Sequence, residues 1–469
     1  MSKSDKDVVF FCTECGYESL KWLGKCPACG NWGTFSEMKK EKETAAQKAG
    51  GSVSLYGSEA KVYSIDDVIV DSEERVFSGI EEADRVFGGG IVRGSVSLIA
   101  GDPGIGKSTL VLMMCGNLAK EHKVLYVSGE ESVKQVKMRA DRLGISAKGL
   151  KLMSEVRLSA VESVIEKEDP EFLVIDSVQT ICDDSLQSAV GSVTQIRETT
   201  SRLMYYAKQK NITVFIIGHI TKDGSIAGPK VLEHMVDTVI NFEGERQLCY
   251  MILRSVKNRF GSTNEIGVFE MKEDGLCQVL NPSAAMLDGR PENVPGTAVV
   301  CSVDGNRPVL IEVQALLSRT TLAMPRRMST GIDYNRVSML IAVLEKRLRY
   351  KMSECDSYIN VIGCIRLTET SSDLGIAAAM MSSYKNRSVK NDTVFIGEIG
   401  LAGEVRGVNH IEQRLSESIR LGFREIFLPA GNRKAAEEFL ARSGAEAKVH
   451  YADRVSALEE IIYSDRSED

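Results

Sequence analysis

The nine residues from Gly101 to Thr109 read GDPGIGKST, which matches the G-x-x-x-x-G-K-[ST] pattern of a phosphate-binding loop. Backbone N–H groups of such a loop point at phosphate oxygens, and the lysine adds a cation that reaches the outer phosphates. The following serine hydroxyl is placed to bind Mg²⁺. A predicted strand before the loop and a predicted helix after it disfavour an accidental glycine loop. The predicted ATP and Mg²⁺ residues are Gly101, Asp102, Pro103, Gly104, Ile105, Gly106, Lys107, Ser108 and Thr109.

A nucleotide-hydrolysing site also needs one carboxylate that holds the hydrated metal and another that orients the attacking water. Asp176 ends the apolar run FLVID and suits the Mg²⁺ role, because the carboxyl end of such a strand faces the nucleotide crevice. Glu130 and Glu131 follow VLYVSG, and motif alignment favours Glu130 as the residue that polarises water. Glu131 alternatively supplies a charge at a helix N-terminus. His219 ends TVFIIGH and either senses the terminal phosphate or is a hydrogen-bonded turn residue.

Four cysteines near the N-terminus form two CxxC pairs separated by ten residues: Cys12, Cys15, Cys26 and Cys29. Two such pairs closing on one ion make the tetrahedral thiolate site that Zn²⁺ prefers. A segment of about 30 residues does not fold on core burial alone, so a bound metal is expected to hold it together. A redox-active pair is the alternative, which the presence of both CxxC pairs disfavours.

A basic pair, Lys257 and Arg259, lies two residues apart in SVKNRFG, roughly 150 residues after the phosphate-binding loop. Short basic turns are usually solvated surface. A direct contact to DNA is a second reading, and completion of the distant phosphate site is a third. The residues alone leave these readings open.

These candidate residues need elements that bring them together, and the sequence predicts an α/β scaffold. Short β-branched runs followed by polar turns alternate with amphipathic segments such as 192–210, which indicates a mainly parallel sheet with crossover helices. The predicted strands of this part are 95–100, 124–129, 172–177, 213–219, 238–244 and 249–256.

Composition divides the chain into four predicted parts. The cysteine-rich segment 1–38 is followed by a linker, 39–60, that begins with the charged and small residues KKEKETAAQKAGGSVS. The α/β pattern occupies 61–287 and ends near the turn-rich NPSAAMLDGRPENVPG. A second large domain, 288–469, contains both further strands and further helices.

The chain has 469 residues, of which 43% are apolar and 26% charged, a composition typical of a soluble globular protein. No apolar run approaches the roughly 20 residues that span a bilayer, and the first residues lack the apolar segment of a secretory signal. We therefore expect a cytoplasmic protein with no membrane partner. Since the net charge is −7, DNA binding would need a local basic surface. The segment 319–351 carries eight basic and two acidic residues, which fits such a surface or an exposed helix face equally well.

The two CxxC pairs, GDPGIGKST, LVIDS, GHITKDGSIAGP and KNRF, in this order, resemble the RadA (Sms) family of bacterial DNA-repair proteins over essentially the full chain. The middle domain is also similar to the RecA and DnaB ATPase cores. The resemblance implies an α/β fold: a RecA-like P-loop ATPase with a mainly parallel sheet, an N-terminal zinc ribbon and a C-terminal Lon-protease-like α+β domain. It also implies that ATP lies between neighbouring subunits of a ring, expected to be a hexamer.

Within such a ring, Lys257 and Arg259 would neutralise phosphate charge in the neighbouring subunit's site, as an arginine finger does. The segment 221–230 would face DNA, with Lys222 and Lys230 as candidate contacts. The residues expected to be catalytic are therefore Lys107, Glu130, Asp176, Lys257 and Arg259.

The C-terminal domain resembles the proteolytic domain of Lon proteases in TETSSDLGIAAAMMSS and FIGEIGLAGEVRGV. A Lon-type site needs a serine nucleophile activated by a lysine base. Alignment places Ser371 at or beside the serine position, but Glu412 at the lysine position. We therefore predict a domain without peptidase activity that serves assembly and DNA binding.

The resulting hypothesis is an ATP-driven DNA motor of the helicase or branch-migration type, acting on single-stranded and branched DNA in recombination and repair alongside the RecA recombinase. The DNA-repair role comes mostly from the resemblance, whereas ATP hydrolysis and Zn²⁺ binding follow from the residues. Two alternatives stay open. One is an ATP-gated scaffold that binds DNA without translocating, and the other is an ATP-dependent Lon-like protease.

Overall fold

In a computed structural model, the described residues are 8–12, 18–19, 21–27, 30, 32–39, 75–219, 229–244, 250–273, 275–321, 324–363 and 366–459. The chain divides into an N-terminal unit, Met1–Glu243 with Ser255–Ser262, and a C-terminal unit, Gly244–Arg254 with Thr263–Asp469. Residues 263–287, which the sequence pattern placed with the ATPase domain, thus group with the C-terminal unit. The predicted boundaries 1–38, 39–60, 61–287 and 288–469 stay predictions. Across the described residues, no helix combines the length and the apolar character needed to cross a membrane.

A small antiparallel sheet of order β2-β1-β3 lies near the N-terminus, built from β1 (Val8–Cys12), β2 (Glu18–Ser19) and β3 (Phe35–Lys39). Cys26 and Phe35 are buried together, with Phe10 and Leu23 packed against them. The Gly30 N–H donates to Cys26 O at 2.9 Å, and Gly30 has a φ of +78°. The chain therefore turns tightly behind the second CxxC pair, where a glycine is suited to the left-handed backbone.

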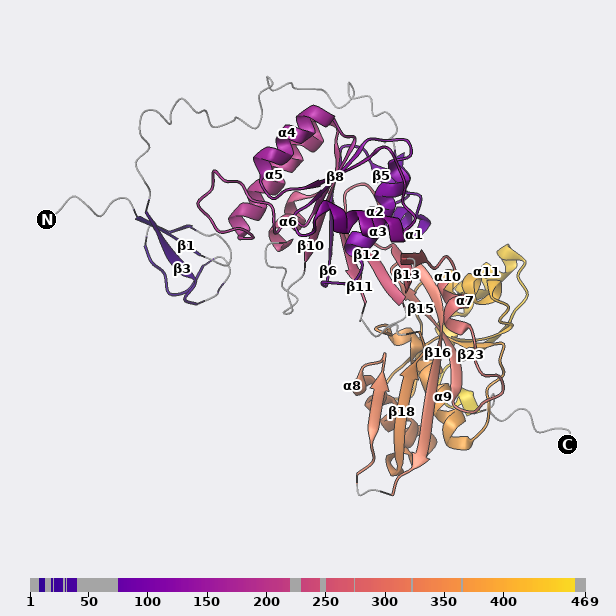
Figure 1. The fold of residues 1–469 in the computed structure, drawn as a ribbon. Coiled ribbons are helices and arrows are strands. Elements are labelled where there is room, and N and C mark those ends of the chain that lie inside the picture. The colour runs from indigo at the N-terminus through magenta and orange to yellow at the C-terminus, as the bar shows by residue number, and fades with distance from the viewer. Residues whose placement is uncertain are drawn as a thin grey trace, which may run out of the picture. The chain divides into compact units, whose positions relative to one another are not determined.

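Six parallel strands in the order β11-β6-β10-β9-β7-β8 form the main sheet of the N-terminal unit (Figure 1). Strands buried on both faces read as continuous apolar runs, and β6, β7 and β9 are buried along their full lengths. Their bounds are β6 (Val96–Gly101), β7 (Val124–Ser128), β8 (Leu150–Ser154), β9 (Phe172–Asp176), β10 (Thr213–His219) and β11 (Thr238–Glu243). Two short strands that precede β6 in the sequence, β4 (Arg75–Val76) and β5 (Ile91–Val92), pair with each other.

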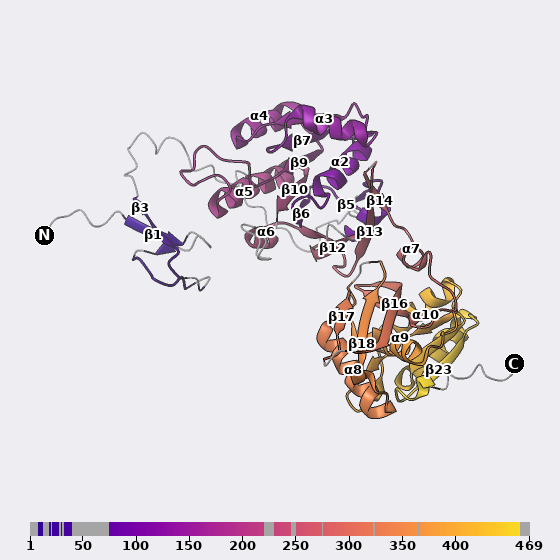
Figure 2. The same cartoon turned by 60° about the horizontal axis from the view of Figure 1, so that its bottom comes forward.

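Helices cover both faces of this sheet. Leu98, Leu125 and Leu173 point to one face, where they pack with residues of α4, α5 and α6. On the other face Phe172 stacks with Phe215, their ring centroids 6.4 Å apart. Figure 2 shows α4, α5 and α6 on one side of the strands and α2 and α3 on the other. The helices are α1 (Glu81–Val86), α2 (Lys107–Leu118), α3 (Val133–Arg142), α4 (Leu158–Glu168), α5 (Val193–Lys210) and α6 (Pro229–Met235).

The parallel register brings the carboxyl ends of the strands to one edge. His219 of β10 lies opposite Gly101 of β6, and Asp176 of β9 lies opposite Ser128 of β7. Side chains at strand ends that are far apart in the sequence therefore meet at this edge, which is where open parallel sheets bind ligands.

The C-terminal unit contains a seven-stranded sheet of order β17-β18-β16-β15-β19-β22-β23. It also contains β13, which pairs antiparallel with the first half of β12 and with β14. The sheet strands are β15 (Thr297–Asp304), β16 (Arg307–Arg319), β17 (Arg327–Thr330), β18 (Cys355–Val361), β19 (Thr393–Phe395), β22 (Glu425–Pro429) and β23 (Lys448–Ala452). The other strands are β12 (Tyr250–Asn258), β13 (Ile266–Lys272), β14 (Gly275–Gln278), β20 (Glu398–Ile399) and β21 (Val405–Arg406).

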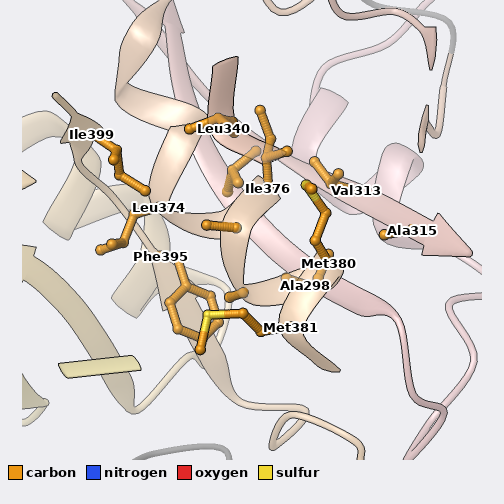
Figure 3. Close-up of a cluster of buried hydrophobic side chains, with 14 of the residues drawn as sticks. Ala298, Val313, Ala315, Leu340, Leu374, Ile376, Met380, Met381, Phe395 and Ile399 are labelled. Carbon is orange, nitrogen blue, oxygen red and sulfur yellow. The ribbon is translucent and has the colours of Figure 1, made fainter. Parts of the chain in front are cut away.

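Helix α9 (Asp373–Lys385) is the centre of this unit's core, because its residues 373–382 are all buried. Ile376 and Met380 pack with Val313 of β16 and Leu340 of α8 in one apolar cluster (Figure 3). Both parallel and antiparallel neighbours occur in the sheet, so the unit is α+β. Its other helices are α7 (Pro282–Leu287), α8 (Tyr334–Leu348), α10 (Ile411–Arg420) and α11 (Arg433–Ser443).

Gly101, at the end of β6, offers a test of this packing. Its φ is +155°, and a Cβ placed on it would stand 2.5 Å from Phe242 O of the neighbouring β11. We expect Gly101→Ala to lower the free energy of unfolding by about 2 kcal/mol, because the backbone of the central sheet must shift. Chemical denaturation of the full chain measures this loss.

The matched control is Gly144→Ala. Gly144 also has a positive φ, +66°, but no atom lies within 4 Å of its Cβ position. This variant carries backbone strain without the clash and should lose about 1 kcal/mol. Equal losses in the two variants would contradict the close approach of β6 and β11.

Candidate functional site

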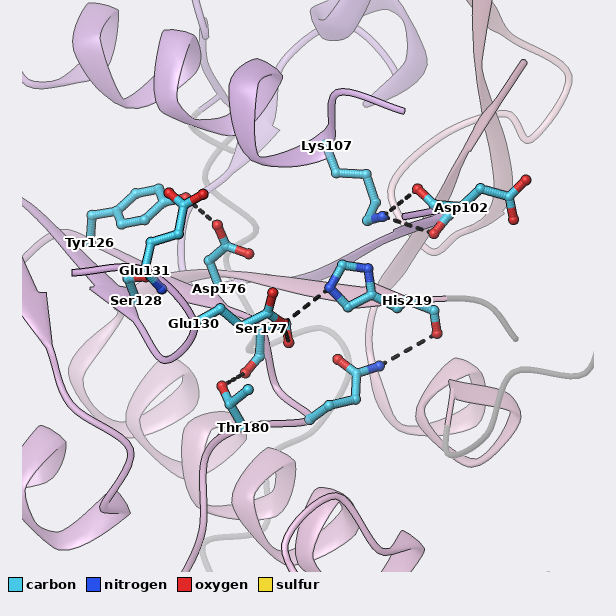
Figure 4. Close-up of polar contacts among 12 residues, drawn as sticks. Asp102, Lys107, Tyr126, Ser128, Glu130, Glu131, Asp176, Ser177, Thr180 and His219 are labelled. Atoms are coloured by element: carbon cyan, nitrogen blue, oxygen red, sulfur yellow. Dashed lines mark hydrogen bonds and ion pairs between the residues drawn. The ribbon is translucent and has the colours of Figure 1, made fainter. Parts of the chain in front are cut away.

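The phosphate-binding loop connects β6 to α2, and glycines shape it. Gly104 and Gly106 have φ values of +80° and +112°, and α2 begins directly after Gly106. Lys107 Nζ donates to Gly101 O at 2.8 Å and to Asp102 O at 2.9 Å, and the side chain is buried (Figure 4). The loop thus holds its lysine over its own backbone, with the N-terminus of a helix beside it.

Burial lowers the pKa of the Lys107 ammonium to about 8, although nearby carboxylates act in the opposite direction. These carboxylates are Asp176, Asp102 and Glu130. The charges nearest to Lys107 are therefore acidic, and the structure brings together the loop lysine and both carboxylates that the sequence assigned to catalysis.

Asp176 ends β9 and is nearly buried. The Tyr126 hydroxyl donates to its Oδ2 at 2.5 Å (Figure 4). Burial, followed by the nearby Asp176 charge, raises the pKa of Tyr126 well above its usual value, so the hydroxyl keeps its proton and remains a donor. Tyr126 therefore fixes one oxygen of the carboxylate that would bind Mg²⁺.

Glu130 and Glu131 point to different partners. Glu130 Oε1 accepts from Ser177 Oγ at 2.6 Å and lies 3.1 Å from His219 Nε2. Glu131 instead pairs with Arg139 of α3. Figure 4 shows Glu130 and His219 facing each other near Lys107 and Asp176. The geometry thus joins Glu130 and His219 at the nucleotide edge and ties Glu131 to a neighbouring helix.

Lys257 and Arg259 make their described contacts with residues of the N-terminal unit other than those around Lys107. Lys257 Nζ donates to Glu233 O at 2.7 Å and to Val236 O at 2.8 Å. Arg259 Nη1 lies 3.1 Å from Asp237 Oδ1. Neither cation makes these bonds with the cluster around Lys107, so the structure of one chain does not unite the five residues that were expected to be catalytic.

Residues of this edge fit ATP with Mg²⁺. Ser108 and Thr109 form the first turn of α2, and Asp176 supplies the hard oxygen ligand that Mg²⁺ prefers. Bound Mg²⁺ would neutralise developing phosphate charge. Gly104 and Gly106 have positive φ values, and glycines, which have no Cβ, let phosphates approach the backbone closely.

The N-terminal cysteines can be judged only in part. Cys26 is buried beside the turn closed by Gly30, which suits a thiolate facing an enclosed ion. The side chain of Cys12, and Cys15 and Cys29 altogether, lie outside the described residues, as do Lys222 and the side chain of Lys230. The four-thiolate site stays a prediction.

The Lon-like part of the C-terminal unit departs from the alignment. Glu412 is exposed and pairs with Arg442. Arg414 takes the place beside Ser371, to whose Oγ its Nη1 donates at 3.1 Å. Arg414 is fully buried and also pairs with Glu369. The lysine position is therefore occupied by Arg414 and not by Glu412, and a guanidinium does not act as a base because it stays protonated.

Sequence reasoning missed four side chains that position others: Tyr126, Ser177, Asp237 and Arg414. Ser177 follows Asp176 directly in the motif LVIDS, so the sequence places it near the nucleotide edge. Tyr126 lies in β7, whose residues are all buried, and reads as core. Nothing local in the sequence indicates which partner each of them meets.

The lowered pKa of Lys107 makes ATP binding dependent on pH. Phosphate oxygens favour the charged ammonium, so binding near pH 8 should take up protons, and affinity should fall as the pH rises above about 8. Isothermal titration calorimetry in two buffers of different ionisation enthalpy measures this uptake. Lys107→Arg is the control, since a guanidinium stays charged throughout. Identical heats in both buffers for the wild type would contradict the lowered pKa.

Three protein-family models match separate parts of the chain. A family model described as AAA domain matches residues 62–225, one described as rubredoxin metal binding domain matches 10–37, and one described as subunit ChlI of Mg-chelatase matches 326–432. A solved KaiC-like protein from Pyrococcus horikoshii OT3 aligns with 44% of this chain and 99% of its own at 20% identity, with a TM-score of 0.37 that is too low to support an argument. The predicted α/β fold, with its mainly parallel ATPase sheet, zinc ribbon and Lon-like C-terminal domain, is confirmed.

Curated relatives match nearly the whole chain. The DNA repair protein RadA of Halalkalibacterium halodurans is 50% identical over 432 residues, 91% of this chain and 93% of its own. The RadA proteins of Bacillus subtilis and Listeria monocytogenes are 50% and 48% identical, over 90% and 92% of this chain and 92% and 94% of their own. At this identity across most of both sequences, the chain belongs to the DNA repair protein RadA family, as its motifs predicted.

Proposed function

We propose that this DNA-repair ATPase is an ATP-driven motor of the helicase or branch-migration type that acts on single-stranded and branched DNA. The observation that carries the proposal is the charge around the phosphate-binding loop. Lys107 is the loop's own cation, and the charges that act on it electrostatically are those of Asp176, Asp102 and Glu130. A triphosphate needs further positive charge as the terminal bond breaks. Part of it comes from Mg²⁺, and the rest has to be delivered by another subunit.

Arg259 suits that delivery. Its side chain is 48% exposed, although its partner Asp237 is nearly buried. An exposed guanidinium on a fixed strand end can reach a neighbouring copy of the chain. We therefore propose a homo-oligomeric ring, expected to be a hexamer, in which Lys257 and Arg259 of one subunit contribute to the site of the next.

Within one subunit the geometry supports the following proposed roles. Lys107 and the loop N–H groups would hold the phosphates, and Ser108 with Asp176 would hold Mg²⁺. Glu130, held by Ser177 and near His219, would orient the attacking water. His219 lies two residues before the segment 221–230, which is expected to face DNA, so binding of DNA there could affect Glu130 through the His219 side chain.

DNA as the partner is supported by the family, whose members are named as DNA-repair proteins. Cooperation with the RecA recombinase, the cytoplasmic location and the preference for single-stranded or branched DNA are proposals that follow from the family resemblance. The zinc ribbon would hold Zn²⁺ through Cys12, Cys15, Cys26 and Cys29.

The two alternatives are weighed by specific observations. A Lon-like protease is disfavoured because Arg414, buried and paired, stands beside Ser371 in place of a base. An ATP-gated scaffold that binds DNA without moving would use the same nucleotide site. Unwinding of a forked duplex separates it from a motor.

ATP turnover with and without single-stranded DNA, followed by unwinding of a forked duplex, tests the proposal. DNA should stimulate hydrolysis, and Arg259→Ala should lower kcat by about 1,000-fold while ATP still binds, since an arginine finger contributes about that much. Mixing Arg259→Ala with Lys107→Ala should partly restore hydrolysis, because interfaces form that combine an intact loop with an intact arginine.

The control is each variant mixed with itself, which should stay inactive. No restoration in the mixture would contradict shared sites. Stimulation by DNA without any strand displacement would favour the scaffold.

Cys26→Ser tests the ribbon. Loss of one thiolate should release most of the Zn²⁺ and unfold the ribbon, while the ATPase fold survives because it belongs to a separate core. Metal content by plasma emission spectrometry measures the loss, and Cys115→Ser, in the buried face of α2, is the control that should retain Zn²⁺. A metal content equal to the wild type in Cys26→Ser would reject the four-thiolate site.

A further inference from the structure

The KNRF turn, Lys257 to Phe260, is anchored at every residue. Asn258 Nδ2 donates to Phe87 O at 3.1 Å, and Phe260 O accepts from Arg75 Nη2 at 2.6 Å. The Arg259 N–H donates to Asp237 O at 3.1 Å. These bonds join the turn to three separate segments of the N-terminal unit. Of its four side chains, that of Arg259 is exposed and the other three are partly covered.

The Lys257 ammonium donates hydrogen bonds to backbone carbonyl oxygens. Besides the bonds to Glu233 O and Val236 O, Nζ lies 3.4 Å from His234 O, so its three protons face three carbonyl oxygens at the end of α6. The last carbonyls of a helix lack partners within the helix and carry partial negative charge, which a cation satisfies. Burial, and then the neighbouring Arg259 charge, lower the pKa of Lys257, as expected for a cation that is partly removed from water.

Arg259 is held differently. The described structure gives it one side-chain bond, from Nη1 to Asp237 Oδ1 at 3.1 Å. The other carboxylate oxygen of Asp237 accepts from the Val96 N–H at 3.1 Å, at the start of the strand that leads to the phosphate-binding loop. Asp237 is therefore a fixed anion, and it orients one edge of the guanidinium while nearly half of the side chain stays in solvent.

We propose that the two cations contribute to the neighbouring site in different ways: Lys257 acts indirectly, by tying β12 to the C-terminal end of α6 within its own subunit, and Arg259, oriented by Asp237, is the one that faces the neighbouring subunit's nucleotide. Lys257 and Asp237 are then positioning residues, and Arg259 is the catalytic group of the motif. This inference rests on the proposed sharing of sites between subunits.

The contacts of Lys257 link α6 to the turn that presents Arg259. Helix α6 begins at Pro229, within the segment 221–230 that is expected to face DNA. Strand β12 ends in the turn that presents Arg259. A shift of α6 is passed by Lys257 to β12, two residues before Arg259. Binding of DNA to one subunit therefore changes the rate of ATP hydrolysis at the site of the next subunit.

The first measurement is amide hydrogen exchange in the full chain, without nucleotide or DNA. Lys257→Ala should raise the exchange rate of the α6 amides about 10-fold, because a capping interaction of roughly 1.5 kcal/mol is lost. Lys257→Arg, which keeps the charge and donors, should restore most of the protection. Arg259→Ala is the matched control and should leave α6 as in the wild type. Unchanged exchange in Lys257→Ala overturns the tie.

The second measurement is ATP turnover with and without single-stranded DNA. In Lys257→Ala the ratio of the two rates should fall towards one, and Lys257→Arg should recover it. Asp237→Asn, which keeps an acceptor for Val96, should lower kcat about 10-fold at an unchanged KM for ATP and leave the ratio intact, since one charged hydrogen bond to Arg259 is lost. A ratio retained in Lys257→Ala, or a raised KM with unchanged kcat in Asp237→Asn, would sink the division of tasks.

These readouts separate this inference from the proposed function. If the wild type shows no stimulation by DNA, the motor fails, yet the exchange of α6 still decides whether Lys257 is the tie. If mixing of Arg259→Ala with Lys107→Ala restores hydrolysis but Lys257→Ala leaves the amide exchange of α6 unchanged, sites shared between subunits are supported. The link from Lys257 to α6 is then contradicted.

Discussion

The nucleotide edge depends on one buried cation. Lys107 is removed from water, held by two carbonyl oxygens of its own loop and influenced electrostatically by three carboxylates. Such a group is costly to bury unless its partners are fixed. The parallel register fixes them, because β6, β9 and β10 end at the same edge and bring Asp176 and His219 to the loop. The rest of the N-terminal unit keeps these strand ends in place.

The acidic surroundings explain why a site with a complete loop and two carboxylates can still be incomplete. Carboxylates hold Mg²⁺ and orient water, but they repel the phosphates whose charge grows during hydrolysis. An oligomer solves this problem, since each subunit can present a cation to the next without burying it in its own site. The half-exposed Arg259, resting against a fixed Asp237, has the properties that such an arrangement needs.

The C-terminal unit shows how a related fold loses one chemistry while it keeps its core. Ser371 remains buried at the start of α9, and the apolar cluster around α9 is intact. Arg414 fills the position beside it and binds Glu369, Ser371 and the Asn409 carbonyl. A guanidinium in this network stabilises the turn but accepts no proton. The C-terminal unit therefore keeps its apolar core but has an arginine beside Ser371.

The sequence by itself determined the elements and the local motifs, because periodicity, glycine spacing and strand-end carboxylates act over a few residues. The loop Gly101–Thr109, Asp176 at the end of β9, and the α/β class with its ribbon were all legible in this way. Only the tertiary structure decided which side chain each group meets. In it, Glu130 contacts His219 and Ser177, whereas Glu131 pairs with Arg139. Arg414 lies where the alignment placed Glu412, and Lys257 binds carbonyl oxygens at the end of α6. Such pairings depend on the packing of segments far apart in the chain, and no local pattern encodes the distance between two side chains.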